Sequence, residues 1–355
     1  MASAKISSTE IKNILPTLAN GDDLSQIESH DFFQQVLAGK IEPALLASVL
    51  TALKIKGETP AEIAGAAIAI RSAATSFPFD NNTGFVADCV GTGGDGANTI
   101  NISTTAAILA AACGLKVAKH GNRSVSSMSG SADLLEAFGV NLSMSPQIAS
   151  NCLSQANLCF LYAPAYHSGF KHAAPVRKSM GIRTLFNILG PLVNPAKPNI
   201  MLLGVYTPEL LMPIAKAVQL TGVKRALILH GSGLDEIALH DDTQVIEIND
   251  GNLTKRTISP EDFGLNRYPL EDIKGGTPKE NADIIKAILS GSGQKAHNAA
   301  VIINCAALLY LHDKADNLKT AAQLASEVLA SGKGLKTLEQ LVVLSNKKNV
   351  DGVNE

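Results

Sequence analysis

The stretch FVADCVGTGGDGANTINISTTAAILAAAC, residues 85–113, joins a short apolar segment, a glycine-rich loop and an alanine-rich segment. Its apolar residues 85–90 predict a β-strand, and residues 105–113 predict a helix. A strand, a glycine-rich turn and a helix are the opening unit of an α/β fold. We therefore expect this stretch to begin a sheet that is covered by helices.

The chain after this unit continues the alternation of strands and helices. Further strands are predicted at 115–119, 158–162, 200–206 and 226–230, and further helices at 132–138, 209–220, 281–289 and 297–311. This order is typical of a mostly parallel central sheet flanked by helices. It predicts a larger α/β domain that spans residues 84–345.

The residues before this domain have helical spacing throughout. Apolar side chains recur at intervals of three and four in 32–37, 44–55 and 61–73. Pro60 lies just inside the third helix, with Thr59 as its expected cap. These features predict a small all-helical domain at residues 1–76. A segment near 165–190, rich in proline and basic residues, is expected to cross back and complete this domain beside a cleft.

The composition excludes several classes of protein. The chain has 355 residues, 46% of them hydrophobic, and a formal net charge of −2, so it carries no basic footprint for nucleic acid. No apolar run approaches the ~20 residues of a membrane span, and the first residues lack a signal-peptide pattern. We expect a cytoplasmic protein. Its five cysteines, with no C-x-x-C spacing, are expected to be buried reduced thiols.

The glycine-rich loop is the first candidate binding site. Four glycines within residues 91–96 let the backbone approach a ligand closely. Their amides, together with the start of the following helix, can form a cradle for a phosphate or pyrophosphate. The spacing matches neither the dinucleotide nor the Walker pattern, so another phosphorylated ligand is predicted. A tight turn that needs glycine only for its geometry is the alternative.

A second loop of the same character follows the next predicted strand. It begins Lys119-His120-Gly121-Asn122-Arg123 and continues with serines up to residue 131. In an open α/β sheet, ligands bind beyond the carboxyl ends of the strands, so this loop is expected beside the first. Taken alone, it is better explained as a solvated loop; the pairing of the two loops favours a shared phosphate site.

Two acidic pairs follow the strand predicted at 226–230. Asp235-Glu236 and Asp241-Asp242 are both positioned to hold a hard cation, and Mg2+ is usually bound by one or two carboxylates plus substrate phosphates and water. Exposed acidic turns are the more common explanation for either pair. The residues alone do not choose between them.

Four motifs taken together resemble the anthranilate phosphoribosyltransferases. They are the glycine-rich loop, the loop that begins at Lys119, the run RTLFNILGPLVNP at 183–195, and GLDE at 233–236. The resemblance extends from the helical N-terminal region to about residue 311. It implies an active site between the two domains, a homodimer formed through the helical domain, and Mg2+ as cofactor, with two ions bound together with phosphoribosyl pyrophosphate.

The resemblance also implies residue roles. Phosphoribosyl pyrophosphate would be bound by Gly91, Gly94, Asp95, Thr99, Asn101, Ile102, Ser103, Thr104, Lys119, His120, Gly121, Asn122, Arg123, Ser124, Val125, Ser126, Ser127 and Ser131. Anthranilate would be held by Asn122 and Arg177, with Gly91, His120, His167 and Gly190 close by. Mg2+ would be ligated by Ser103, Asp235 and Glu236. Lys119, beside the leaving pyrophosphate, and Arg177, on the anthranilate carboxylate, are the expected catalytic residues.

Two other functions are compatible with this architecture, and the sequence departs from the family pattern at one place. A pyrimidine-nucleoside phosphorylase shares the expected architecture, and a non-catalytic nucleic-acid-binding relative could retain the fold; the acidic pair and the mildly acidic composition disfavour them. Where relatives tend to carry Arg-Asp before an alanine-rich helix, this chain has His297-Asn298. We expect that difference to affect only a peripheral ion pair.

Overall fold

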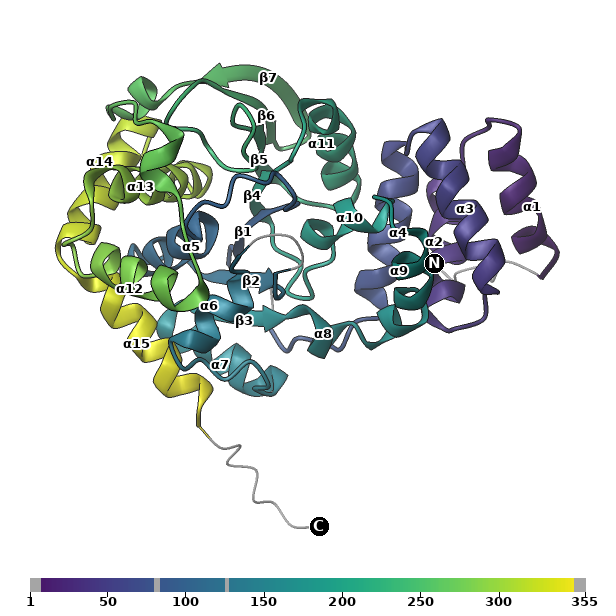
Figure 1. The fold of residues 1–355 in the computed structure, drawn as a ribbon, viewed down its shortest axis with the longest axis horizontal. Coiled ribbons are helices and arrows are strands. Elements are labelled where there is room, and N and C mark those ends of the chain that lie inside the picture. The colour runs from purple at the N-terminus through teal and green to yellow at the C-terminus, as the bar shows by residue number, and fades with distance from the viewer. Residues whose placement is uncertain (1–7, 80–83, 125–127, 348–355) are drawn as a thin grey trace, which may run out of the picture.

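The computed structural model describes residues 8–79, 84–124 and 128–347. A helical bundle lies at one end and a larger α/β unit at the other, as Figure 1 shows. The bundle is formed by α1 (Ser8–Ala19), α2 (Gln26–Leu37), α3 (Pro43–Lys56) and α4 (Pro60–Ser72). Thr59 caps α4 as predicted, because its side chain accepts from the Glu62 amide while the Glu62 carboxylate accepts from the Thr59 amide.

The α/β unit is built on one seven-stranded sheet. Its strands are β1 (Ala87–Gly91), β2 (Val117–Gly121), β3 (Leu158–Tyr162), β4 (Ile200–Gly204), β5 (Arg225–His230), β6 (Thr243–Asn249) and β7 (Asn252–Ile258). The order across the sheet is β3-β2-β1-β4-β5-β6-β7. β1 to β5 are mutually parallel, and β6 and β7 add an antiparallel edge. The prediction of a mostly parallel sheet is confirmed.

The strand order reverses at β1. The chain runs outward from β1 through β2 to β3, then returns to place β4 on the other side of β1. Gly91 lies opposite Gly204, and Gly121 lies opposite Tyr162, so these four strands end along the same edge. Ligands of open α/β proteins bind in the crevice at such a reversal. The glycine-rich loop leaves β1 at this point.

Helices cover both faces of the sheet. They are α5 (Ile102–Ala112), α6 (Ser131–Ala137), α7 (Pro146–Ala156), α11 (Leu211–Leu220), α12 (Pro278–Leu289), α13 (Lys295–Leu311), α14 (Leu318–Ala330) and α15 (Lys333–Ser345). α5 and α13 pack in one core with α7, α14 and α15, whereas α11 shares a second core with the helical bundle. α5 is alanine-rich after its first turn and is buried nearly all round.

The segment between β3 and β4 reaches the helical bundle. It contains α8 (Ala163–Tyr166), the 3-10 turn η2 (Ser168–His172), α9 (Ala174–Met180), α10 (Phe186–Leu189) and the 3-10 turn η3 (Gly190–Leu192). α9 lies beside the bundle in Figure 1. The His172 ring lies against Gly39, and Gly169 packs on Leu37. The crossing segment therefore contacts the bundle.

The remaining secondary-structure predictions differ in detail. The hairpin of β6 and β7 and the helix α7 were not predicted, and α5 begins three residues before the predicted start at residue 105. All five cysteines are free, as predicted, but Cys113 is only half-buried. Within the described ranges, no helix is long and apolar enough to cross a membrane.

Gly204, at the end of β4, allows a close approach that a side chain would block. A Cβ atom there would overlap the backbone of Asp235. Gly204→Ala is expected to lower the free energy of unfolding by about 1–3 kcal/mol, because a packed backbone must shift. Thermal unfolding should show a lower Tm for Gly204→Ala and an unchanged Tm for Gly190→Ala, whose added methyl group meets open space. Equal Tm values for the two variants would contradict this packing.

Candidate active site

One cavity of about 810 Å³ lies between the carboxyl edge of the sheet and the crossing segment. Every predicted site residue that the structure describes lines this cavity. Val125, Ser126 and Ser127 were also predicted to bind phosphoribosyl pyrophosphate, but they lie outside the described residues. Motifs that are far apart in the sequence therefore meet at the strand-order reversal.

The acidic pair Asp235-Glu236 faces the glycine-rich loop and the start of α5. Asp235 Oδ2 accepts a hydrogen bond of 2.6 Å from the Gly93 amide, and Glu236 Oε1 accepts one of 3.0 Å from the Ser103 amide. The N-cap residue of α5, Asn101, makes no capping bond with its own side chain. Glu236 thus accepts a hydrogen bond from a free helix amide, at the end of the helix where the helix dipole favours negative charge.

Two glycines permit this contact. A Cβ atom on Gly91 would collide with the Asp235 carboxylate, and one on Gly204 would collide with the Asp235 backbone. The loop that carries the acidic pair therefore lies directly on the ends of β1 and β4. Glycine is required at both positions for close approach.

The acidic pair has the electrostatics of a cation site. Burial raises the pKa of Asp235, and the negative charge of Asp95 raises it further. Burial likewise raises the pKa of Glu236, with a further contribution from Asp235. A divalent cation would relieve this repulsion. Two carboxylates beside the Ser103 hydroxyl fit Mg2+, which completes its octahedron with substrate oxygens and water.

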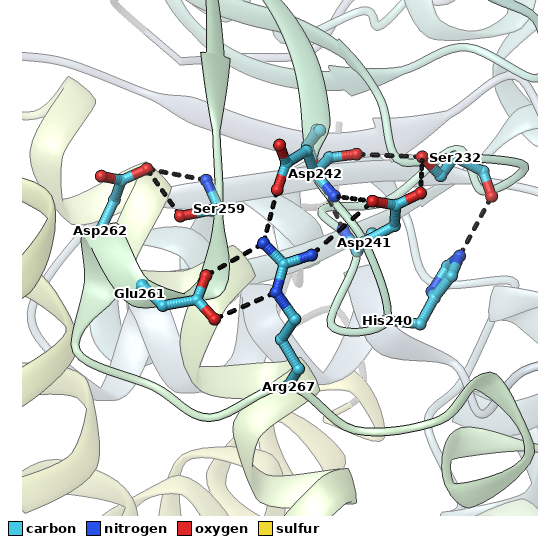
Figure 2. Close-up of polar contacts among 10 residues, drawn as sticks. Ser232, His240, Asp241, Asp242, Ser259, Glu261, Asp262 and Arg267 are labelled. Atoms are coloured by element: carbon cyan, nitrogen blue, oxygen red, sulfur yellow. Dashed lines mark hydrogen bonds and ion pairs between the residues drawn. The ribbon is translucent and has the colours of Figure 1, made fainter.

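The second acidic pair has a different environment. Arg267 Nη2 donates to Asp242 at 2.6 Å, and Arg267 Nη1 lies 3.6 Å from Asp241. The Ser232 hydroxyl also donates to Asp241 at 3.1 Å, as Figure 2 shows. Neither of these two carboxylates lines the cavity. The structure thus separates two pairs that the residues alone left equivalent.

Lys119 lies at the floor of the cavity. It is a buried residue of β2, and its Nζ donates to the Cys89 carbonyl at 2.6 Å and approaches the Ser103 hydroxyl at 3.5 Å. An ammonium group has three N–H donors, so further donors can serve a ligand. The position next to Ser103 places this positive charge beside the acidic pair.

Asn194 and Asp88 are buried polar residues that hold the segment after η3 against the sheet. The Asn194 amide donates to Asp88 Oδ2 and to the Ala118 carbonyl, both at 2.8 Å. Burial raises the pKa of Asp88 to about 6. Asn194 lies in the segment between η3 and β4, so these bonds fix this segment against β1 and β2.

His120 and His167 form a contact on another wall. Their Nε2 atoms are 3.2 Å apart, and their rings meet edge to face. Burial, followed by the neighbouring His167, lowers the pKa of His120 to about 3, and burial lowers the pKa of His167 to about 4. Both rings are therefore neutral at pH 7, with one nitrogen donating and the other accepting.

The histidine pair makes stability fall in acid. The unfolded pKa of 6.5 lies above both folded values, so the unfolded chain binds more protons between pH 6.5 and about 4. Stability is complete above pH 6.5 and declines as the pH falls. His167→Gln removes one of these groups. Urea unfolding should show a loss between pH 7 and pH 5 that is about 1–2 kcal/mol smaller in His167→Gln than in the wild type. An identical loss in both proteins would refute the assignment.

The two predicted arginines differ in their surroundings. Arg177 of α9 is half-buried, with its guanidinium 5.1 Å from the centre of the Phe186 ring, and burial lowers its pKa. Arg123 is exposed and pairs with Asp133 at 3.0 Å and with Glu136 at 2.7 Å. Arg177 is thus presented to the cavity from the crossing segment, whereas Arg123 is already neutralised by α6.

Arg183 and Tyr206 are among the cavity-lining residues that the sequence prediction did not name. Arg183 donates to the Gly94 carbonyl at 2.7 Å, and its guanidinium lies 4.2 Å from the centre of the Tyr206 ring. Arg183 belongs to the run at 183–195, and Tyr206 follows the carboxyl end of β4. These positions could have marked both residues as candidates, but no role was predicted for either. Together they tie the glycine-rich loop to the crossing segment and to β4.

The departure from the family pattern lies at the start of α13. His297 is buried, and the Asn298 amide donates to the Gly293 carbonyl at 3.1 Å. Neither residue lines the cavity.

This fold and site define a transferase of the glycosyl transferase type. The family model described as "Glycosyl transferase family, a/b domain" matches residues 83–335, and "Glycosyl transferase family, helical bundle domain" matches residues 12–74. The chain belongs, more narrowly, to the anthranilate phosphoribosyltransferase family. It is 79% identical to the anthranilate phosphoribosyltransferase of Colwellia psychrerythraea, over 98% of this chain and 95% of that one, and 54% identical to that of Aeromonas salmonicida, over 94% and 98%.

Solved structures agree with this assignment. The crystal structure of the Thermus thermophilus anthranilate phosphoribosyltransferase has a TM-score of 0.89 and 40% identity, covering 94% of this chain and all of that chain. The Saccharomyces cerevisiae enzyme in complex with PRPP and Mg has a TM-score of 0.86 and 31% identity, covering 96% and 98%.

Proposed function

We propose that the chain transfers the 5-phosphoribosyl group of phosphoribosyl pyrophosphate to the amine of anthranilate. The products are N-(5-phosphoribosyl)anthranilate and pyrophosphate, and the step belongs to tryptophan biosynthesis. The names of the relatives support the reaction, and the yeast complex with PRPP and Mg supports the substrate and cofactor. The observation that carries the proposal is the convergence of the four motifs on one cavity at the strand-order reversal.

Asp235, Glu236 and the Ser103 hydroxyl would hold Mg2+ together with substrate oxygens, and we propose two ions. Bound there, Mg2+ would neutralise charge on the pyrophosphate. The amides of the glycine-rich loop would cradle phosphate oxygens. Lys119 would donate to the departing pyrophosphate. One N–H of its ammonium group is used by the Cys89 carbonyl at 2.6 Å, and the other donors can serve the ligand.

Arg177 would bind the other substrate. A guanidinium can grip a carboxylate with two parallel hydrogen bonds, and Arg177 lines the cavity from α9, whereas Lys119 lines it from β2. Asn122 and the neutral His120 and His167 rings would border the aromatic ring of anthranilate. The aromatic amine is neutral at physiological pH, so attack on the ribose C1 carbon requires positioning more than a strong base.

The proposal extends to the domain organisation, the oligomeric state and the location of the protein. We propose that residues 1–76 and 84–345 act as two domains and that the chain forms a homodimer through the helical domain. Ile27 and Ile55 of that domain are 70% and 82% exposed, which favours an apolar contact. Free cysteines favour a reducing, cytoplasmic location. None of the relatives described above is a pyrimidine-nucleoside phosphorylase or a nucleic-acid-binding protein, so those alternatives lack support.

The reaction is tested by the loss of anthranilate fluorescence. Purified protein is mixed with anthranilate, phosphoribosyl pyrophosphate and Mg2+, and each component is omitted in turn. A decrease that requires all three supports the proposal. The absence of a decrease with folded protein would refute it, and phosphorolysis of thymidine or uridine would then be measured.

The metal assignment is tested with two matched double variants. Asp235→Asn with Glu236→Gln removes both charges in the cavity and should lower kcat/KM by 100-fold or more at millimolar Mg2+, which corresponds to about 2.7 kcal/mol. Asp241→Asn with Asp242→Asn removes the same charge outside the cavity and should change kcat/KM by less than about threefold. Equal effects in the two double variants would show that the wrong pair was chosen.

A further inference from the structure

The Asp235-Glu236 pair lies in a loop whose backbone is held by buried side chains from elsewhere in the fold. This loop, Gly231–Asp242, follows β5 and is called here the acidic loop. Its carboxylates meet the Gly93 and Ser103 amides at 2.6 and 3.0 Å, so small shifts of the loop would separate them. The residues that fix the loop therefore determine where the two carboxylates lie.

His230, the last residue of β5, contacts the beginning of the acidic loop. Its Nδ1 is 2.8 Å from the Val205 carbonyl oxygen, and its Nε2 is 3.1 Å from the Gly233 amide nitrogen. A carbonyl only accepts and an amide N–H only donates, so Nδ1 carries the proton and Nε2 is the acceptor. One neutral tautomer of a buried imidazole satisfies both partners.

The turn that His230 contacts is tight. Gly231 and Leu234 exchange two backbone hydrogen bonds, of 2.9 and 3.2 Å. Ser232 and Gly233 between them have φ values of +47° and +99°, which is the pattern of a type I′ turn. Left-handed backbone at a serine is unfavourable by itself and persists where the surroundings impose it. The His230 acceptor provides such a constraint at Gly233.

Asn304 contacts the other side of the acidic pair. It is fully buried in α13, a helix of mainly alanine, isoleucine and leucine, where a polar side chain is costly unless it is hydrogen-bonded. Its Oδ1 accepts from the Ile237 amide at 3.1 Å, and its Nδ2 donates to the Ala300 carbonyl at 2.9 Å. Both polar atoms are thus used, and one of them holds the residue that follows Glu236.

We propose that His230 and Asn304 are positioning residues that hold the backbone on either side of the acidic pair. His230 holds Gly233, two residues before Asp235, and Asn304 holds Ile237, one residue after Glu236. They fix the backbone so that both carboxylates point at the cavity before any ligand arrives. This inference rests on the proposed role of Asp235 and Glu236 in binding Mg2+ with phosphoribosyl pyrophosphate. Groups that orient metal ligands typically change metal affinity by 10–100-fold when they are removed.

The far end of the acidic loop is held differently. Arg267 pairs with Asp242 at 2.6 Å and with Glu261 at 3.0 Å, and the His240 ring meets the Ser232 carbonyl (Figure 2). The side chains of Arg267, Asp242 and Glu261 are 40%, 52% and 57% exposed, and exposed ion pairs constrain a backbone weakly. Arg267→Ala therefore serves as a control that loosens the same loop away from the contacts of His230 and Asn304.

Two substitutions at His230 separate positioning from simple packing. Glutamine extends its amide to the place of Nε2, so His230→Gln keeps an acceptor for Gly233. Asparagine places its amide where Nδ1 was, so His230→Asn keeps the donor to Val205 and leaves the Gly233 amide without its acceptor. Both variants lose the ring, and they differ in which hydrogen bond survives.

The test measures the Mg2+ concentration for half-maximal turnover, the KM for anthranilate, and Mn2+ binding to the protein loaded with phosphoribosyl pyrophosphate by calorimetry. His230→Asn should raise the half-saturating Mg2+ concentration and the Mn2+ dissociation constant about tenfold or more, with KM for anthranilate unchanged. His230→Gln should stay within about threefold of wild type, and Arg267→Ala should stay within about twofold. Asn304→Leu, if folded, should match His230→Asn.

Three results would overturn the proposal. Equal shifts in His230→Asn and His230→Gln would mean that the ring matters only for packing, and an equal shift in Arg267→Ala would mean that any loosening of the loop suffices. A change in KM for anthranilate alone would place the effect elsewhere. The double variant Asp235→Asn with Glu236→Gln tests the metal assignment itself. If it binds Mn2+ as tightly as the wild type does, Asp235 and Glu236 are not the metal ligands.

Discussion

The contact of Asp235 and Glu236 with the amides of Gly93 and Ser103 is the constraint on which the site depends. It joins the end of β5 to the glycine-rich loop after β1 and to the first turn of α5. A buried carboxylate is costly, and these two are stabilised by backbone donors that would themselves otherwise be unpaired. The position of Asp235 also excludes side chains at Gly91 and Gly204, and both carboxyl groups of the pair line the cavity.

Much of the α/β frame could be predicted from the sequence. β3 matches its predicted range, β5 ends at its predicted residue, and the other parallel strands end within two residues of the predicted position, because apolar periodicity is a local signal. The start of α5 could not be predicted, since its first turn is capped by Glu236, 133 residues away from Ser103. The β6–β7 hairpin was missed because its exposed second strand carries polar residues.

The candidate site was predictable as a set of motifs but not as a geometry. The residues offered two acidic pairs, and only the fold shows that Asp241 and Asp242 face Arg267 while the other pair faces the cavity. The family resemblance placed Arg123 among the ligands of phosphoribosyl pyrophosphate, yet α6 supplies two carboxylates to it. His230 and Asn304 gave no signal, since each resembles an ordinary buried polar residue until its partners are known.

The proposed reaction depends on a site for a cation and pyrophosphate at the strand-order reversal, on Asp235 and Glu236. The most direct measurement is anomalous X-ray scattering from crystals soaked with Mn2+ and phosphoribosyl pyrophosphate, with Mn2+ standing in for Mg2+. An anomalous peak is expected within about 2.5 Å of the carboxylate oxygens of this pair. A peak beside Asp241 and Asp242, with none at Asp235 and Glu236, would contradict it.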